Sequence, residues 1–333
     1  MYEYIGIDIS KSTLQVYLGR FDQDIEVENS HKGLRQLQAK VKKLYGKATK
    51  VVWIYEPTGS YSALVKRFCF EHDILSYIIK PSQSSAFAKT IKNRNKNDIV
   101  DARMLYKMHI VASKEDVVVP KYDAELDSLH NYLRYYKTII KERVIKTNQL
   151  EAALHRGDET FIIRKLRSKI KALKDEEKEI IQTMLKSVEE NTEYKECFLA
   201  ITSLKGIGNI SGLVLFELFM QYKDASAKEI VALCGLDPVE VSSGSSIKRK
   251  SRISKQGSRL VRNALFMPTL TAINHNPHMQ AIYDRLKENG KHSTVAQIAV
   301  MRKMVVIAFS LFKTKQCYEM DRYLITGVGK LAA

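Results

Sequence analysis

Residues 4–11 read Tyr-Ile-Gly-Ile-Asp-Ile-Ser-Lys, and this stretch decides the fold. Five of the six residues before Ser10 are apolar, aromatic or glycine, which is typical of a central strand buried on both faces. Asp8 is the exception. A lone carboxylate in such a strand is costly unless a cation or hydrogen bonds meet it. Asp8 therefore either lies at a polar end of the sheet or holds a metal ion.

Three further acidic residues favour the metal. Residues 51–55, Val-Val-Trp-Ile-Tyr, form a second buried-type strand that ends on Glu56, and a Pro-Thr-Gly turn follows it. Asp98 and Asp101 begin a helical pattern, and residues three apart share one face of a helix. Two strand carboxylates and this helical pair predict a cage of oxygen ligands for one or two Mg²⁺ ions, with Mn²⁺ as an alternative.

Composition points to a polyanionic partner. The chain has 333 residues, enough for two or three domains. Its 54 lysine and arginine residues exceed 37 aspartate and glutamate residues, giving a formal net charge of +17. Charge alone does not separate a nucleic acid from an anionic membrane surface.

The sequence argues against a membrane or secreted protein. No apolar run approaches the about 20 residues that a membrane span needs, and no cleavable signal precedes the first strand. The four cysteines lack the spacing of a disulfide framework or a zinc site. We expect a cytoplasmic protein.

Residues 1 to about 115 are predicted to be α/β. Three strands, a helix and then alternating strand and helix give the order of an RNase H-like fold. Pro81 is expected to end the last strand, and a basic segment with Lys89, Lys92, Arg94 and Lys96 follows. The predicted strands are 4–11, 13–18, 25–28, 51–55 and 74–79, and the predicted helices are 32–44 and 61–71.

Pro120 marks a predicted domain boundary. Between residues 126 and 188 apolar residues recur every three or four positions, and Gly157 is the only glycine. This pattern predicts two long antiparallel helices with polar outer faces. Such a hairpin has little core of its own, which favours pairing with a second copy over a role as an intramolecular spacer.

A Gly-x-Gly turn follows at residues 206–208, next to Lys205 and before an apolar helix at 210–219. Backbone N–H groups of such a turn can meet a phosphate. The pattern resembles the helix-hairpin-helix of many DNA-binding proteins. An ordinary helix connector is the alternative.

A serine-rich loop at residues 241–246, Val-Ser-Ser-Gly-Ser-Ser, leads into a basic stretch without acidic residues. A serine beside glycine and facing cations is suited to attack a phosphodiester. A loop that only grips phosphate is the simpler interpretation, and composition alone favours it. Residues 260–314 are predicted to be helical. The cations after the loop are Lys248, Arg249, Lys250, Arg252, Lys255, Arg259 and Arg262.

Together these motifs resemble the DEDD transposases, the recombinases of insertion-sequence family one-ten, with the Piv-type DNA invertases. The N-terminal landmarks are Gly-Ile-Asp-Ile-Ser-Lys at 6–11, Glu-Pro-Thr-Gly-Ser-Tyr at 56–61, Phe-Ala-Lys at 87–89, Lys-Asn-Asp at 96–98 and Asp-Ala-Arg at 101–103. The C-terminal ones are Gly-Leu-Asp-Pro at 235–238, Ser-Ser-Gly at 242–244 and Arg-Ile-Ser-Lys-Gln-Gly at 252–257.

The resemblance implies a role for each acid and for one serine. Asp8, Glu56, Asp98 and Asp101 fall where the family binds Mg²⁺ in a RuvC-like domain, and Ser243 falls where it places its nucleophilic serine. The choice of Ser243 over its neighbour Ser242 follows the family pattern only. Asn97 and Pro57 depart from that pattern, but they flank the acids without replacing them.

The resemblance also implies three regions: a RuvC-like domain at 1–120, a helical hairpin at 121–195 and a C-terminal transposase domain at 196–333. Its members in insertion sequences use a noncoding bridge RNA to choose target and donor DNA. Because the acids and the serine lie in different domains, we expect a homodimer or tetramer to assemble the active site. The alternatives are a RuvC-like nuclease that uses water, and a nucleic-acid-binding protein without catalysis.

Overall fold

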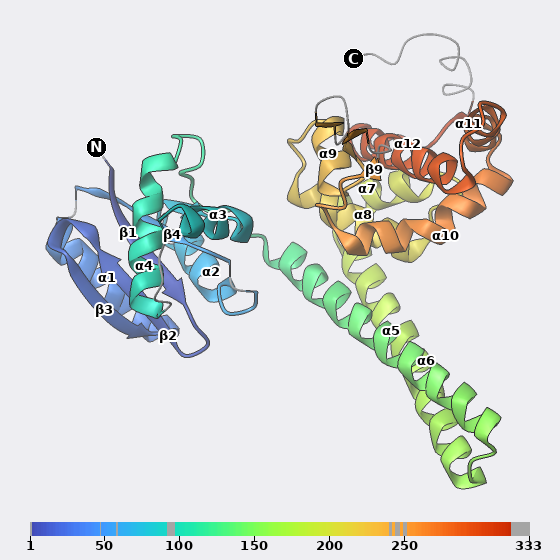
Figure 1. The fold of residues 1–333 in the computed structure, drawn as a ribbon, viewed down its shortest axis with the longest axis horizontal. Coiled ribbons are helices and arrows are strands. Elements are labelled where there is room, and N and C mark those ends of the chain that lie inside the picture. The colour runs from blue at the N-terminus through green and yellow to red at the C-terminus, as the bar shows by residue number, and fades with distance from the viewer. Residues whose placement is uncertain are drawn as a thin grey trace. The chain divides into compact units, whose positions relative to one another are not determined.

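The chain folds into two compact units, Met1–Asp123 and Ala124–Ala333. The computed structural model describes residues 2–46, 48–57, 59–91, 97–239, 242–243, 247–248 and 252–320. Figure 1 labels the elements of both units, which are described separately below.

The first unit is built on a mixed five-stranded sheet with the order β3-β2-β1-β4-β5. β1 pairs antiparallel with β2 and parallel with β4, so it lies at the centre of the sheet as its sequence predicts. This α/β arrangement is compatible with an RNase H-like domain. The strands are β1 (Tyr2–Ile9), β2 (Thr13–Leu18), β3 (Gln23–Glu28), β4 (Lys50–Tyr55) and β5 (Ser76–Ile78).

Helices cover both faces of this sheet. Ile5 and Ile7 of β1 pack in a cluster with buried residues of α1 and α2. Val52 and Ile54 of β4 pack in another cluster with Leu105 of α4. Side chains alternate along a strand, so β4 contributes Trp53 and Tyr55 to the first cluster and Val52 and Ile54 to the second. The helical elements are η1 (Gly19–Phe21), α1 (His31–Tyr45), α2 (Ala63–Glu71), α3 (Pro81–Ile91), α4 (Asp98–Lys107) and η2 (Met108–Val111).

Helix α3 was not among the helices predicted from the sequence. Pro81 follows the end of β5, as predicted, and is the first residue of this helix, which carries Lys89 of the predicted basic segment. Proline is favoured in the first helical turn, where its missing N–H costs nothing. The Lys80 N–H donates to Oε1 of Gln83 at 3.1 Å, which satisfies a backbone donor at the helix start.

The second unit begins with the predicted pair of long helices, α5 (Ala124–Arg156) and α6 (Thr160–Glu190), which run side by side in Figure 1. The chain reverses at Gly157, whose φ of +72° lies in the left-handed region that glycine adopts most easily. Arg143 Nε and Glu177 Oε2 lie 3.0 Å apart across the pair. The hairpin therefore has ionic as well as apolar contacts along its seam.

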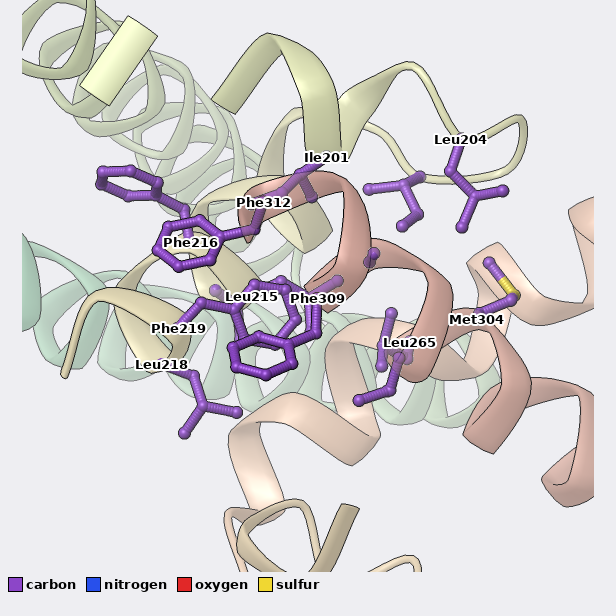
Figure 2. Packing of buried hydrophobic residues seen from close by; sticks show 14 of the residues in the cluster. Ile201, Leu204, Leu215, Phe216, Leu218, Phe219, Leu265, Met304, Phe309 and Phe312 are labelled. Carbon is purple, nitrogen blue, oxygen red and sulfur yellow. The ribbon is translucent and has the colours of Figure 1, made fainter. Parts of the chain in front are cut away.

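The core of the second unit forms around α8. This helix is apolar on nearly every side, as expected of a helix that others enclose. Phe219 of α8 lies 5.0 Å from Phe309 and 5.5 Å from Phe312, measured between ring centroids, and Figure 2 shows these rings together. The remaining elements are α7 (Thr192–Thr202), α8 (Asn209–Gln221), α9 (Ala227–Leu233), β6 (Pro238–Val239), β7 (Ser242–Ser243), β8 (Ile247–Lys248), β9 (Arg252–Ile253), α10 (Arg259–His275), α11 (Pro277–Glu288) and α12 (Ser293–Thr314).

Helix α12 is long and mostly apolar. Among the described residues it is the one helix long and apolar enough to cross a membrane, with 22 residues. Arg302 and Lys303 interrupt its apolar sequence, so it contains no continuous apolar run of that length. Val300, Met304 and Ala308 are fully buried, so α12 is a core helix of the second unit.

Candidate functional site

Asp8 and Glu56 lie at the same end of two neighbouring strands. β1 and β4 are parallel neighbours, and Ile7 lies opposite Tyr55. The next residue along each strand is therefore Asp8 and Glu56, respectively. Both side chains are half-buried, which agrees with the sequence prediction that the two acids share a strand end.

Gly6 determines what covers these acids. Alternation along β1 places Gly6 and Asp8 on the face opposite to Ile5 and Ile7. A Cβ atom at Gly6 would lie 2.1 Å from the Ala102 carbonyl oxygen, in the backbone of α4. Only glycine lets the helix lie this close to the strand, so α4 rests directly beside Asp8.

The first turn of α4 carries the other two acids. The side chain of Asn97 caps this helix, because its Oδ1 accepts a hydrogen bond from the Val100 N–H at 2.8 Å. Asp98 and Asp101 follow in the first turn, where the helix dipole stabilises negative charge. Asn97, a departure from the family pattern, is thus a good helix cap.

Arg103 joins α4 to β2 and β3. Its Nε lies 3.1 Å from both carboxylate oxygens of Asp24 on β3, and its Nη2 donates to Oδ2 at 2.5 Å. The guanidinium also lies over the Tyr17 ring of β2, 4.7 Å from the centroid. These contacts of Arg103 hold α4 in place two residues after Asp101.

The four carboxylates interact electrostatically. Burial is the largest cause that raises the pKa of Asp8, to about 6. The negative charges of Asp101 and Asp98 raise this pKa further, and that of Glu56 adds less. A hydrogen bond from the Ile9 backbone opposes the rise in the pKa of Asp8.

The donor chemistry of this cluster fits a divalent cation. Carboxylate oxygens suit Mg²⁺ or Mn²⁺, and a cation beside them would favour the ionised form of Asp8. Among the residues that the structure describes, however, no three His, Cys, Asp or Glu side chains converge closely enough to hold one metal ion. Asp8 lies close enough to the other three acids for their charges to raise its pKa, and their role as metal ligands stays a prediction.

Ser84 is a site residue that the sequence did not reveal. It lies on α3, is only 4% exposed, and its Oγ donates to Oε2 of Glu56 at 2.6 Å. The two residues are 28 positions apart, and a serine within Ser-Gln-Ser-Ser carries no local signal of such a contact. This hydrogen bond fixes one oxygen of Glu56.

The described residues in and around the predicted serine loop form a small nested hairpin. Its outer strands β6 and β9 pair antiparallel, with Pro238 opposite Ile253. Its inner strands β7 and β8 pair with Ser243 opposite Ile247. Of the residues predicted to form the loop, the structure describes Ser242 and Ser243, and both lie in β7.

A network at its base fixes this hairpin to the helical core. The Asp237 carboxylate accepts a 2.5 Å hydrogen bond from Ser254 Oγ. Arg262 Nη1 donates to the carbonyl oxygens of Cys234 and Gly257, each at 2.9 Å. Arg262 therefore holds the base of the hairpin in place. Its contact with nucleic acid stays a prediction.

The other predicted nucleic-acid contacts are distributed over both units. Those described with exposed side chains are Lys89 on α3, Lys205 before α8, Arg252 on β9, Lys255 after it and Arg259 at the start of α10. Lys248 lies on β8. Lys92, Arg94, Lys96, Arg249 and Lys250 lie outside the described residues.

The Gly-x-Gly turn differs from its prediction in one respect. The Ile207 N–H donates to the Leu204 carbonyl at 2.9 Å, and the Gly208 N–H donates to Ser211 Oγ at 3.0 Å. Both groups are satisfied within the turn and are not free for a phosphate. Gly206, at φ +110°, packs against Pro268 of α10, so the turn is a tight helix connector.

Comparison with known proteins identifies the family. Residues 5–157 match a family model for IS110-type DEDD proteins described as "Transposase", and residues 199–284 match one described as "Transposase IS116/IS110/IS902 family". The four acids lie in the first match and Ser243 lies in the second. The chain therefore belongs to the IS110 family of transposases, enzymes that cut and rejoin DNA.

Individual relatives agree with this assignment. The chain is 26% identical over 327 residues to the "Pilin gene-inverting protein" of Moraxella lacunata and to that of Moraxella bovis. Each comparison covers 95% of this chain and 97% of the relative. Over 120 residues the chain is also 26% identical to the "Insertion element IS110 uncharacterized 43.6 kDa protein" of Streptomyces coelicolor, covering 36% of this chain and 29% of that protein.

Proposed function

We propose that the chain is an insertion-sequence transposase that exchanges DNA strands through a phosphoserine intermediate, using Ser243 and four metal-binding carboxylates. The observation that carries the proposal is the acidic cluster on one face of the sheet. Asp8 is half-buried among three other carboxylates, and its pKa of about 6 reflects that burial and their charges. An arrangement of this kind is costly unless a cation compensates it.

In this proposal Asp8 and Glu56, on adjacent strand ends, and Asp98 and Asp101, on α4, bind Mg²⁺ or Mn²⁺. The bound ion would polarise the scissile phosphodiester and stabilise charge on the leaving 3′ oxygen. Gly6 and Arg103 support the same geometry, since they position α4 against the sheet.

Ser243 supplies the nucleophile. Its Oγ attacks phosphorus, the bond from phosphorus to the 3′ oxygen breaks, and the serine proton ends on that oxygen. In the reverse step a 3′ hydroxyl of the partner strand attacks the phosphoserine, and Ser243 recovers its proton. One phosphodiester is exchanged for another, so strand exchange needs no external energy source.

The proposed partners are target DNA, donor DNA and a noncoding bridge RNA, in the cytoplasm. The net charge of +17 supports phosphate-rich partners. The acids belong to the first unit and Ser243 to the second. We therefore assign the assembly of a complete active site to a homodimer or tetramer on DNA.

Strand-exchange assays with labelled target and donor DNA, the element's noncoding RNA and Mg²⁺ test this proposal. Asp98→Ala and Ser243→Ala should each abolish exchange, while Ser242→Ala should retain it. Cleavage that survives Ser243→Ala but not Asp98→Ala would instead identify a water-dependent nuclease. Omitting the RNA should abolish the choice of target.

Site-specific DNA inversion is a second candidate function that would use the same chemistry. It is favoured by the similarity to two pilin gene-inverting proteins over 95% of the chain. A DNA molecule that carries two inverted recombination sites distinguishes inversion from transposition. Recombination of that molecule, without exchange between separate donor and target molecules, would assign inversion.

A further inference from the structure

Charge is segregated along α6. The fifteen residues from Thr160 to Lys174 contain six cations and no acidic residue. The following sixteen residues, Asp175 to Glu190, contain six acidic residues and two lysines. The half of the helix next to the Gly157 turn is therefore strongly basic. The six cations are Arg164, Lys165, Arg167, Lys169, Lys171 and Lys174.

Four of these cations form a continuous stripe. Arg164, Arg167, Lys171 and Lys174 are separated by three, four and three residues, which places them on one side of the helix. Each directly follows a half-buried residue of the seam with α5, so the stripe runs along the edge of that seam. These seam residues are Ile163, Leu166, Ile170 and Leu173.

The stripe is available to a partner. All four side chains are exposed. In the part of the chain that the structure describes, the ion pairs of the hairpin involve other residues, such as Arg143 with Glu177 and Arg156 with Asp158. No acidic side chain of the described hairpin lies within ion-pair distance of the stripe.

Next to the stripe lies an exposed aromatic ring. Phe161 is 60% exposed, and Lys165 Nζ lies 5.5 Å from its ring centroid. The guanidinium of Arg164 lies 5.8 Å from the same centroid. An exposed ring among cations is a surface on which a nucleic-acid base can stack.

We infer that this stripe binds the phosphate backbone of a nucleic acid. At 1.5 Å per residue, Arg164 and Lys174 are about 15 Å apart along the helix. One strand of duplex DNA carries a phosphate about every 3.4 Å of axis, so the stripe spans about four phosphates. Charge complementarity thus favours a polyanion over a second copy of this basic face.

The test replaces all four stripe residues with glutamine in the full chain and measures binding to duplex DNA and to structured RNA across salt concentrations. The salt slope should fall on the nucleic acid that the stripe binds, by about 3 to 4 if this is duplex DNA, since each phosphate contact there contributes about 0.9. A larger loss on RNA than on DNA assigns the stripe to RNA, and the reverse assigns it to DNA.

The control removes the same charge from α1 of the first unit, by Lys32→Gln, Arg35→Gln, Lys42→Gln and Lys43→Gln. This variant should change the slope by less than about 1. A stripe variant with the slope of the wild type or of the control on both DNA and RNA would overturn the inference. A change in oligomeric state at an unchanged slope would also overturn it and assign the face to protein pairing.

Ser84 carries an independent inference that rests on the proposed metal site. The geometry points to Ser84 as a positioning residue for Glu56. Its hydroxyl has one proton and two acceptors in reach, Glu56 Oε2 at 2.6 Å and the Pro81 carbonyl at 3.0 Å. The shorter contact goes to the carboxylate. Oε2 is thereby held against α3, and the orientation of the whole carboxylate is fixed.

Mn²⁺ binding by the full chain, measured by calorimetry, tests this role. Ser84→Ala should weaken Mn²⁺ affinity about tenfold, the lower end of the usual effect of a group that orients a metal ligand. Ser85→Ala, at the exposed neighbouring position, should leave it unchanged. A lower melting temperature with unchanged Mn²⁺ affinity would show that Ser84 is merely structural. Absence of Mn²⁺ binding by the wild type would instead refute the proposed metal site.

Discussion

Replacing Gly6 with alanine should push α4 off the sheet and separate its two acids from Asp8. The new Cβ would lie 2.1 Å from the Ala102 carbonyl oxygen and 2.5 Å from the Tyr106 nitrogen. Both are backbone atoms, so no side chain can rotate away. Relief requires a shift of about 1 Å, since real Cβ atoms essentially never approach within 3.0 Å.

Overpacking of this kind costs about 1 to 3 kcal/mol of unfolding free energy. For a unit of this size roughly 4 °C of melting temperature corresponds to each kcal/mol, so the transition of the first unit should fall by roughly 4 to 12 °C. Mn²⁺ affinity should fall as well, because Asp98 and Asp101 move with the helix.

Differential scanning calorimetry of the full chain measures the first effect, and Mn²⁺ titration at a temperature where the variant is folded measures the second. Gly208→Ala is the control, because a Cβ there meets nothing within 4 Å. Unchanged stability in Gly6→Ala would refute the close packing of α4. Lost stability with unchanged Mn²⁺ affinity would show that the α4 acids do not share a metal site with Asp8.

Two further predictions concern ion pairs. Arg103→Lys keeps the positive charge but loses the paired contacts to Asp24, so Mn²⁺ affinity should fall several-fold. Asp24→Asn should lower Mn²⁺ affinity to a similar extent. Wild-type Mn²⁺ affinity in both variants would contradict the role of Arg103 in positioning α4. His130 on α5 lies 2.9 Å from Glu217 on α8, and this hydrogen bond raises the pKa of His130 above its usual value near 6.5. Its stabilising effect should be complete below about pH 6 and lost as pH rises through the raised pKa. His130→Gln should therefore lower the melting temperature at pH 5.5 and not at pH 8.5, and an equal loss at both pH values would contradict this assignment.

The sequence predicted those parts of the site that depend on local pattern. The buried strands ending near Asp8 and Glu56 are evident from their apolar runs, and parallel pairing then places the two acids at one edge. The Asp98–Asp101 spacing likewise predicted a shared helical face, and the long hairpin was evident from its periodicity and from Gly157.

What the sequence did not reveal depends on contacts between distant segments. Ser84 reaches Glu56 only because α3 forms after Pro81, and a proline followed by serines resembles a loop more than a helix start. The role of Gly6 could not be predicted because the sequence does not show which helix packs against β1. In the Gly-x-Gly turn the Gly208 N–H is satisfied by Ser211, whose side chain could have bonded elsewhere.

Mass spectrometry of the protein after reaction with labelled donor and target DNA, the noncoding RNA and Mg²⁺ tests serine recombination most directly. After nuclease digestion, the peptide that contains Ser242 and Ser243 should carry a nucleotide through a phosphodiester bond to Ser243. The adduct should be absent from Ser243→Ala and from Asp98→Ala. Recombined or cleaved DNA without any protein-bound nucleotide would contradict the phosphoserine mechanism.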